Sequence, residues 1–491
     1  GQSEGFEITG GTLNDTITGG AGNDTINGGD GTDTVNYTGA VTITSDANGF
    51  MVDAGLEGID TLNGVEKVIA GAQTFLLVGN GGYDSIQDAV DAATGDEIIL
   101  VSGNYIESVT IDSTKAGLTI EGLAGSQLTG GIFVQADGVN ISKLMILEGA
   151  TLGGQPGGIV VAASDVTLSD LTLSKSGTEG TLGGTTRGIV NAGGEGANLL
   201  ISNVMVSGFA TGVFLNPGAD GARVVDSVLS NNFVGLSNDD PDNFEITGTQ
   251  FVENTFEQIG LGIVDQSEDL SGVVGAGNTF TNSNAAVPNV SIYPLGATNA
   301  VQEIIGTVQA DQFNGDQTNN GAAQRFEGGA GNDTINLGGG DDIAVGGEGN
   351  DTINGGAGQD TLTGGTGSDT FAFTAAGQTA TIAATDNDAN GAVSNGDTFT
   401  GNFDVITDFV SLDNDMIDLS AINNLATPGD VFANLQMNEF QFIKGDFAAG
   451  VFTANDVDGA DTLVAFDDGT SDVGVILLGV DSLNENDDFI S

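Results

Sequence analysis

Two arrays of tandem nonapeptides constrain this chain more than any other feature. The first array runs from Gly10 to Asn36 as GGTLNDTIT, GGAGNDTIN and GGDGTDTVN. The second runs from Gly328 to Ala372 as GGAGNDTIN, LGGGDDIAV, GGEGNDTIN, GGAGQDTLT and GGTGSDTFA. Both arrays follow the pattern GGxGxDxUx, in which U is apolar. A fixed period of this kind predicts a stacked repeat architecture.

The period also predicts the local structure. Six Gly-rich residues form a turn, three residues with one inward apolar side chain form a short strand, and two nonapeptides complete one coil. Turns eighteen residues apart then stack on the same side. The pairs are Asp15 with Asp33, Asp333 with Asp351, Asp342 with Asp360, and Asp351 with Asp369. Stacked carboxylates repel one another unless a cation lies between them, and the Gly residues let turn carbonyls face the same ion.

The amino-acid composition indicates which kind of cation the repeats would bind. The chain has no Cys and no His, which leaves oxygen ligands and therefore hard ions such as Ca²⁺. The predicted ligands are the eight repeat aspartates: Asp15, Asp24, Asp33, Asp333, Asp342, Asp351, Asp360 and Asp369.

Some repeats fit the pattern less well. GGTLNDTIT lacks the fourth-position Gly, and GTVQADQFN at 306–314 reads as a decayed repeat that contains Asp311. Asp24 has no aspartate eighteen residues away, because Phe6 and Thr42 occupy those positions. We therefore expect a strong calcium stack in the second array and only a partial cage at Asp24.

The arrays resemble the RTX (repeats in toxin) calcium-binding β-roll. The segments FDVITDFVSLDNDMIDLSAI at 403–422 and VILLGVDSLNENDDFIS at 475–491 are similar to the C-terminal regions of RTX proteins exported by type I secretion. The resemblance implies a secreted bacterial protein, extracellular or at the cell surface, that binds several Ca²⁺ ions. An ordinary β-rich cap is the alternative interpretation of the C-terminal segment.

A second, looser repeat lies between the arrays. VNISKLMI, VTLSDLTL, LLISNVMV, RVVDSVLS and FEITGTQF share one alternating apolar pattern between residues 139 and 251. If Ile141, Leu168, Ile201, Val225 and Ile246 are equivalent, the steps are 27, 33, 24 and 21 residues. Alternation predicts strands, and this step length is that of one coil of a three-sheet helix. The middle of the chain is therefore predicted to be a right-handed parallel β-helix.

One amphipathic helix is expected near 84–94. Asp84 is the expected N-cap, and Ile86, Ala89, Val90 and Ala93 share one face. We expect that face to plug the N-terminal end of the β-helix and to shield its unpaired edge. The segment YDSIQDAVDAATGDEIILVSGNYIESVTI resembles the opening of pectate-lyase-like β-helix proteins, and GIDTLNGVEKVIAG at 58–71 is similar to a connector that follows RTX repeats.

Together these patterns predict an all-β chain in six parts. They are an N-terminal RTX roll (1–40), a connector (41–74), the β-helix with its capping helix (75–290), a linker with the decayed repeat (291–325), a C-terminal RTX roll (326–373) and a type I secretion domain (374–491).

Charge limits the partners. With 68 acidic residues against 8 Lys and Arg, the formal net charge is −60. Nucleic acid is excluded as a partner because phosphates need clustered basic residues. The longest apolar runs are far shorter than the roughly 20 residues of a membrane helix, so no membrane span is expected.

The same inventory argues against catalysis. Without His, the acid and His machinery of polygalacturonases and RTX alginate epimerases is absent. A lyase would need a basic residue beside acids, and Arg223 near Asp226, Asp239 and Asp240 is the candidate; the alternative is that Arg223 simply pairs with an acid. We predict a non-enzymatic structural protein that forms a homo-oligomer or polymer as a surface layer, filament or matrix. The alternative is a polysaccharide-binding or lyase-like protein.

Overall fold

The computed structural model describes most of the chain. The described residues are 4–147, 150–152, 155–175, 186–192, 197–217, 219–239, 244–263, 267–269, 278–281, 290–294, 302–315, 323–373, 383–385, 398–400, 403–410, 414–418, 440–449, 451–455, 459–467, 472–480, 483 and 489–490. They group into two compact units, Gly1–Ile259 with Gly275–Val287 and Gly260–Val274 with Pro288–Ser491.

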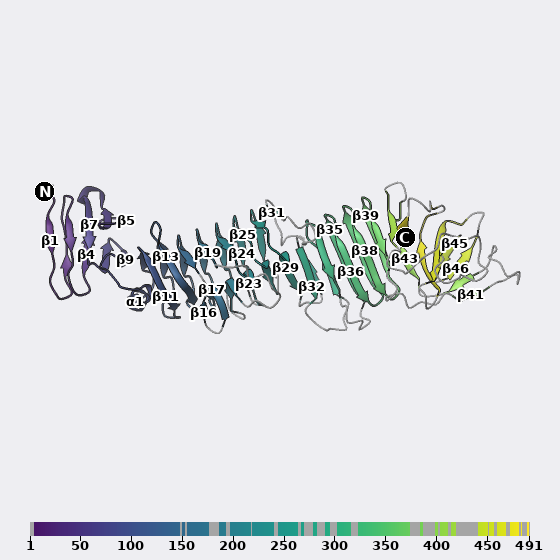
Figure 1. The fold of residues 1–491 in the computed structure, drawn as a ribbon, viewed down its shortest axis with the longest axis horizontal. Helices are drawn as coiled ribbons and strands as arrows, with labels where there is room; N and C mark the ends of the chain where they lie inside the picture. The colour runs from purple at the N-terminus through teal and green to yellow at the C-terminus, as the bar shows by residue number, and fades with distance from the viewer. Residues whose placement is uncertain are drawn as a thin grey trace. The chain divides into compact units, whose positions relative to one another are not determined.

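The first unit begins with short strands, most of which stack in parallel (Figure 1). The strands are β1 (Glu7–Thr9), β2 (Thr16–Ile17), β3 (Thr25–Asn27), β4 (Thr34–Tyr37), β5 (Thr42–Asp46), β6 (Gly49–Asp53), β7 (Ile59–Asn63), β8 (Lys67–Ala70) and β9 (Gln73–Val78). β1, β3 and β7 form one stack, and β2, β4 and β8 form the other. Between them lie Ile26, Val35, Leu62 and Val68, which are fully buried. The predicted roll of residues 1–40 therefore shares its stacks and its core with β7 and β8, which lie in the predicted connector.

A hairpin interrupts this roll. β5 and β6 pair antiparallel with each other, and β6 pairs antiparallel with β7. The coil that follows β4 is thereby lengthened from eighteen residues to thirty-six, because Ile26 aligns with Leu62.

A parallel β-helix follows the roll in the first unit, with three faces of stacked strands. One face holds β10 (Ile98–Val101), β12 (Thr119–Gly122), β14 (Asn140–Ser142), β18 (Thr167–Ser169), β21 (Leu200–Ser202), β24 (Arg223–Val225) and β27 (Glu245–Thr247). The second holds β15 (Met145–Leu147), β19 (Thr172–Ser174), β22 (Met205–Ser207), β25 (Val228–Ser230), β28 (Gln250–Val252) and β31 (Thr279–Thr281). The third holds β11 (Asn104–Ile111), β13 (Gln127–Val134), β17 (Gln155–Val161), β20 (Arg187–Asn191), β23 (Thr211–Leu215) and β26 (Val234–Asn238), with β16 (Ala150–Leu152) antiparallel to β17.

The register confirms four of the five equivalent positions and corrects one. Ile120, Ile141, Leu168 and Ile201 align in successive coils, and Ile246 ends the row. The residue between Ile201 and Ile246 is Val224, not Val225. Two adjacent valines fit the alternation equally well, but only Val224 is fully buried.

The helix α1 (Ile86–Ala92) lies beside β11 (Figure 1). Its buried residues are Ile86, Ala89 and Val90, as expected. Its N-cap is Ser85 rather than Asp84, because the Ser85 side chain accepts a hydrogen bond from the Asp88 N–H. The short hydroxyl reaches the third helical amide, which is the usual N-cap geometry.

The helix shields only part of the β-helix end. The Gln87 side chain donates to the Thr110 carbonyl and accepts from the Thr110 N–H, which satisfies the edge of β11 at that residue. The face that contains β10 has no such edge, since β10 pairs with β9 and β9 pairs with β8. That face therefore continues into the N-terminal roll.

The second unit also contains two parallel stacks. One holds β32 (Val290–Pro294), β34 (Asp311–Asn314), β36 (Thr334–Gly339), β38 (Thr352–Ala357), β40 (Thr370–Ala372), β44 (Met416–Asp418) and β49 (Phe489–Ile490). The other holds β30 (Ser267–Asp269), β33 (Gln302–Ile305), β35 (Gln324–Ala330), β37 (Ile343–Glu348), β39 (Thr361–Thr366), β43 (Asp404–Ile406) and β48 (Asp472–Leu477). Phe313, Ile335, Ile353, Leu362 and Phe371 are fully buried in the core of this C-terminal roll.

The C-terminal segment continues the roll and then changes to antiparallel pairing. β43 and β44 add parallel strands to the two stacks. β48 then pairs antiparallel with β47 (Asp461–Asp467), followed in the sheet by β45 (Phe440–Ala448), β46 (Val451–Ala454), β42 (Thr398–Thr400) and β41 (Ala383–Thr385). Apart from α1 and a short 3₁₀ turn at Gly55–Glu57, the described residues are all strand, turn or irregular chain, which confirms the all-β class.

Candidate metal centre

Repeat aspartates in the C-terminal roll form a continuous hydrogen-bonded column, here called ladder A. The Oδ1 atom of each carboxylate accepts the backbone N–H of the aspartate one coil earlier. Distances are 2.8 Å from Asp311 to Asp333, 2.8 Å from Asp333 to Asp351, 2.9 Å from Asp351 to Asp369, and 2.9 Å from Asp369 to Asp415. The predicted eighteen-residue pairs in this array are therefore present.

A second column, ladder B, lies on the other turn of the same roll. The Oδ1 of Asp342 accepts the Gln324 N–H at 2.7 Å, Asp360 accepts that of Asp342 at 2.9 Å, and Asp404 accepts that of Asp360 at 2.9 Å. Both ladders run past the last nonapeptide into the segment after residue 400.

The second carboxylate oxygens are what make these ladders a candidate metal centre. Within the part of the chain that the structure describes, the Oδ2 atoms of seven predicted ligands are buried and have no hydrogen-bond partner. They belong to Asp24, Asp33, Asp333, Asp342, Asp351, Asp360 and Asp369. A buried ionised oxygen without a partner is costly, so each must take up a proton or face a cation.

Burial raises the pKa of the ladder carboxyls in the C-terminal roll. In ladder A it raises the pKa of Asp333 to about 8 and that of Asp369 to about 6, and neighbouring ladder carboxylates add to both shifts. In ladder B it raises the pKa of Asp342 to about 7 and that of Asp360 to about 6. Without a cation, the roll therefore holds protons at pH values where an ordinary aspartate is charged.

Glycine lies beside six of these seven oxygens, and the repeat that contains Asp342 begins with Leu337 instead. A Cβ on Gly346 would lie 2.2 Å from the Asp351 Oδ2 and 2.5 Å from the Gly364 carbonyl oxygen. The second and fourth glycines of a repeat have positive φ, as at Gly329 (100°) and Gly331 (125°), which side chains rarely adopt. The turn thus keeps backbone oxygens and the carboxylate together with no side chain between them.

This donor set fits a hard cation. Among the described residues, no group of three or more Asp, Glu, His or Cys side chains could hold a metal alone. A bound Ca²⁺ would therefore need backbone carbonyl oxygens as well as the carboxylates, which is the mixed oxygen set that Ca²⁺ accepts. Ligation by the eight repeat aspartates stays a prediction.

The N-terminal roll has two shorter ladders. In ladder C, Asp24 accepts the Phe6 N–H at 2.7 Å, and Asp60 accepts the Asp24 N–H at 2.8 Å. In ladder D, Asp33 accepts the Asp15 N–H at 2.7 Å, and Glu66 accepts the Asp33 N–H at 2.6 Å.

The expectation that Asp24 lacks a stacking partner is wrong. Its partner Asp60 lies thirty-six residues on, because the β5–β6 hairpin adds eighteen residues to that coil. Asp15 differs from the other ligands: it is partly exposed, and its Oδ2 accepts the Gly11 N–H at 2.6 Å.

Several ladder residues lie outside the nonapeptides and were not predicted. They are Asp60, Glu66, Asp404 and Asp415, together with Asp408, whose two oxygens each accept an N–H at 2.8 Å, from Gly364 and Gly365. A sequence signal exists for part of the set, since FDVITDF and LDNDMID each place an acid directly before an alternating apolar strand.

A separate outer ladder uses the fifth residue of the repeat. The Asn332 side chain accepts the Asn350 N–H, the Asn350 side chain accepts the Ser368 N–H, both at 3.0 Å, and Asp341 accepts the Gln359 N–H at 2.9 Å. These side chains are exposed. The recurrent Asn before the Asp of the repeat is therefore explained by turn stacking, not by ligation.

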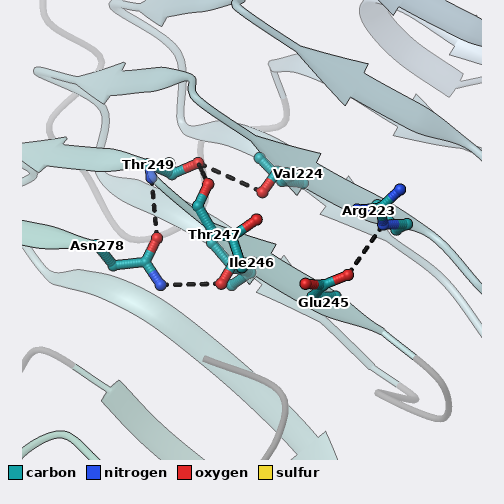
Figure 2. A network of polar contacts seen from close by, with 7 residues as sticks. All are labelled: Arg223, Val224, Glu245, Ile246, Thr247, Thr249 and Asn278. Atoms are coloured by element: carbon teal, nitrogen blue, oxygen red, sulfur yellow. Dashed lines mark hydrogen bonds and ion pairs between the residues drawn. The ribbon is translucent and has the colours of Figure 1, made fainter. Parts of the chain in front are cut away.

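Arg223, the basic residue of the lyase alternative, pairs with Glu245 in the described part of the chain. Its Nε donates to Glu245 on the neighbouring strand at 2.9 Å, as Figure 2 shows, and both side chains are exposed. Asp226 lies on an exposed turn, and Asp239 interacts electrostatically with Arg187 on the third face. Asp240 lies outside the described residues. The interpretation that Arg223 pairs with an acid is confirmed.

A comparison with family models identifies the repeats. The model for the RTX calcium-binding nonapeptide repeat (4 copies) matches residues 9–39, 318–349 and 338–371. The chain carries RTX calcium-binding repeats. Proteins with RTX repeats are typically secreted, and these repeats generally bind calcium.

The other comparisons are less informative. No curated protein is significantly similar to the chain. Among solved structures, the chain is similar to the Dettilon tailspike protein at 13% identity, with 62% of this chain and 70% of that chain covered and a TM-score of 0.33. A likeness this distant carries no functional weight. Within the described residues, no helix is long and apolar enough to cross a membrane.

Proposed function

We propose that this protein is a secreted, calcium-dependent structural protein that assembles with copies of itself as a surface layer, filament or matrix. The observation that carries the proposal is the pair of ladders in the C-terminal roll. Among the described residues, five buried carboxylate oxygens there have no hydrogen-bond partner, at Asp333, Asp342, Asp351, Asp360 and Asp369. Calcium would neutralise these oxygens and lower the net charge of −60.

Export is consistent with this chemistry. A ligand that binds only the folded state shifts the folding equilibrium by mass action. In a cytosol poor in calcium the rolls would stay loosely folded, and they would fold outside the cell, where calcium is plentiful. The similarity of the C-terminal segment to type I secretion regions supports the same route.

We propose no catalytic role. The chain has no His, and the basic residue best suited to lyase chemistry, Arg223, pairs with Glu245.

Calcium dependence is tested by circular dichroism and calcium counting during titration with a chelator. Asp351→Asn removes a ladder charge while its amide oxygen can still accept the Asp333 N–H. Glu348→Gln is the matched control, since it removes an exposed charge in the same repeat as Asp351. We expect fewer bound ions and a lower melting temperature for Asp351→Asn alone. Unchanged β-structure and melting after complete calcium removal would contradict the proposal.

Self-assembly is tested separately by light scattering and electron microscopy. We expect ordered assemblies at high protein concentration with millimolar calcium and dispersed particles in chelator. Monomeric particles under both conditions would leave calcium binding intact but exclude the assembly role.

A second candidate, polysaccharide binding, is favoured by one observation on the β-helix. Ile146, Leu173, Val206 and Leu229 point into the core. The residues beside them on the second face are uncharged: Met145, Leu147, Thr172, Ser174, Met205, Ser207, Val228 and Ser230. A neutral glycan could therefore approach this face of an otherwise acidic protein.

The test of this candidate is glycan binding with a charge placed on that face. Ser207→Asp would be compared with Ser202→Asp on the first face, together with an assay for unsaturated uronate products. Binding lost only in Ser207→Asp would support the second candidate, and equal affinities would count against it.

A further inference from the structure

Two ladder carboxylates, unlike the repeat aspartates with a bare Oδ2 among the described residues, accept a hydrogen bond from a protein hydroxyl. The first is Asp60, the last residue of ladder C, which is fully buried. Its Oδ1 accepts the Asp24 N–H, and its Oδ2 accepts the Tyr37 hydroxyl at 2.8 Å. Tyr37 is itself only 6% exposed, and burial together with the Asp60 charge raises the pKa of its phenol, so the hydroxyl keeps its proton.

The second is Asp311, the first residue of ladder A. Its Oδ2 accepts the Thr307 N–H at 2.6 Å, and its Oδ1 accepts the Thr307 hydroxyl at 2.8 Å. Both residues are buried, at 3% and 1% exposure. Thr307 occupies the second position of the decayed repeat, where intact repeats have Gly. The sequence change that weakens the motif therefore introduces the hydroxyl donor.

Asp60 and Asp311, at the ends of their ladders, differ chemically from the other ladder aspartates. At Asp24, Asp333, Asp351 and Asp369 the Oδ2 atom is buried with no donor among the described residues. A cation or a proton is needed there. At Asp60 and Asp311 burial still raises the net pKa of the carboxyl, to about 7 at Asp311. Hydrogen bonds lower the pKa of both carboxyls, and hydrogen bonds to a charged group are the stronger kind. The need for an ion is correspondingly reduced.

We propose that the hydroxyls of Tyr37 and Thr307 replace calcium at these two ends, so that the ends stay folded when calcium is removed and the ions bind only at the steps between. The inference rests on the proposed calcium binding and adds which carboxylates do not take part. Each permanent end then serves as a template on which calcium orders the next coil, because stacking onto a formed coil avoids the cost of nucleation.

The test is hydrogen exchange in chelator and in calcium, with calcium stoichiometry measured on the same samples. Tyr37→Phe and Thr307→Val remove only the hydroxyls. Tyr105→Phe and Thr352→Val are the controls: the Tyr105 hydroxyl donates to the Ser102 carbonyl, and Thr352 is exposed at the seventh repeat position.

In wild-type protein without calcium, we expect β36 to β39 to exchange freely while β7 and β34 stay protected. Tyr37→Phe should accelerate exchange in β7, and Thr307→Val in β34, by at least tenfold in chelator, and calcium should restore protection with an additional bound ion. Variants that match their controls while the wild-type roll responds to calcium would overturn this inference. If the exchange rates of all strands were the same with and without calcium, the proposed calcium-dependent function itself would be overturned.

Discussion

The repeat aspartate combines two tasks in one side chain. Its Oδ1 closes a hydrogen bond to the previous coil, and its Oδ2 is left for a proton or an ion, as at Asp351. Loss of the side chain therefore removes a structural contact as well as a charge. Loss of an exposed repeat acid such as Glu348 removes only the charge.

Truncation of ladder aspartates measures both tasks. From the sequence, Asp333 stands at the end of its array and should matter less than Asp351. In the structure Asp333 is an interior step, since it accepts the Asp311 N–H. We expect Asp333→Ala and Asp351→Ala to lower the free energy of unfolding comparably, by ~1–3 kcal/mol for the unpaired amide before any calcium loss. Denaturant titration with Glu348→Ala as control checks this, and a much milder Asp333→Ala would contradict it.

The first glycine of each repeat is expected to be as sensitive as the aspartate. A Cβ at Gly346 would overlap the Asp351 Oδ2, whereas a Cβ at Gly39 would meet nothing within 4 Å. Gly346→Ala should weaken calcium binding at this step by tenfold or more, and Gly39→Ala should leave it unchanged. Isothermal titration of both variants with calcium is the measurement. Equal calcium affinities would show that the space left by Gly346 is not needed for binding.

The stacking partners of individual aspartates could be predicted from the sequence where the eighteen-residue period is uninterrupted. Asp33, Asp351 and Asp369 were placed correctly because no insertion interrupts their coils. Asp60 could not be placed, because a hairpin of unknown pairing separates it from Asp24. The repeat period could not predict donors such as the Tyr37 hydroxyl, because Tyr37 lies in a strand and not in the repeated turn.

Among the elements, the helix α1 depends on its first residue. The Ser85 hydroxyl accepts the Asp88 N–H at 3.0 Å. Ser85→Ala should destabilise the first unit by about 1 kcal/mol, the usual value for a lost N-cap, whereas Asp84→Ala should have little effect. Thermal unfolding of the two variants separates the cap seen in the structure from the one expected from sequence.

The calcium-free C-terminal roll should lose stability as the pH rises, and calcium should offset that loss. Burial raises the pKa of Asp333 from 3.8 to about 8, so the calcium-free fold binds protons more tightly than the unfolded chain. Its stability is then fully present below pH 3.8 and is lost as the pH rises through 8. Calcium competes with those protons, so the calcium-loaded roll should gain stability relative to the free roll across the same window.

Melting curves at several pH values, in calcium and in chelator, check this pH dependence of the stability. We expect the largest calcium stabilisation at the alkaline end and the smallest at the acid end. A stabilisation that does not vary with pH would mean that the ladder carboxylates are already ionised without metal.

Strands were predictable where the apolar alternation and the repeat period agreed. The domain boundaries stay predictions. The β-helix coils followed from buried rows such as Ile141, Leu168 and Ile201. The change to antiparallel pairing at β47 and β48 did not, because pairing direction depends on connections that the apolar pattern does not record.

At the scale of the whole molecule, two kinds of charge must be distinguished. Most of the 68 acidic side chains contribute to a field that dissolved salt can screen. The ladder carboxylates are buried, and mobile ions in solution do not screen them. Sodium should therefore relieve the general repulsion without filling the ladders.

Scanning calorimetry at matched ionic strength separates the two effects. Starting from chelated protein, added NaCl should raise the melting temperature modestly, because it weakens repulsion across the acidic surface. CaCl₂ at the same ionic strength should raise it much further and do so at lower concentration, because each ion bound in a ladder stabilises only the folded state. Magnesium is the sharper control, since it demands a near-octahedral site and gives up water reluctantly, and it should behave like sodium. If all three salts act alike, calcium acts on this protein only as a screening ion, and the buried oxygens hold protons instead.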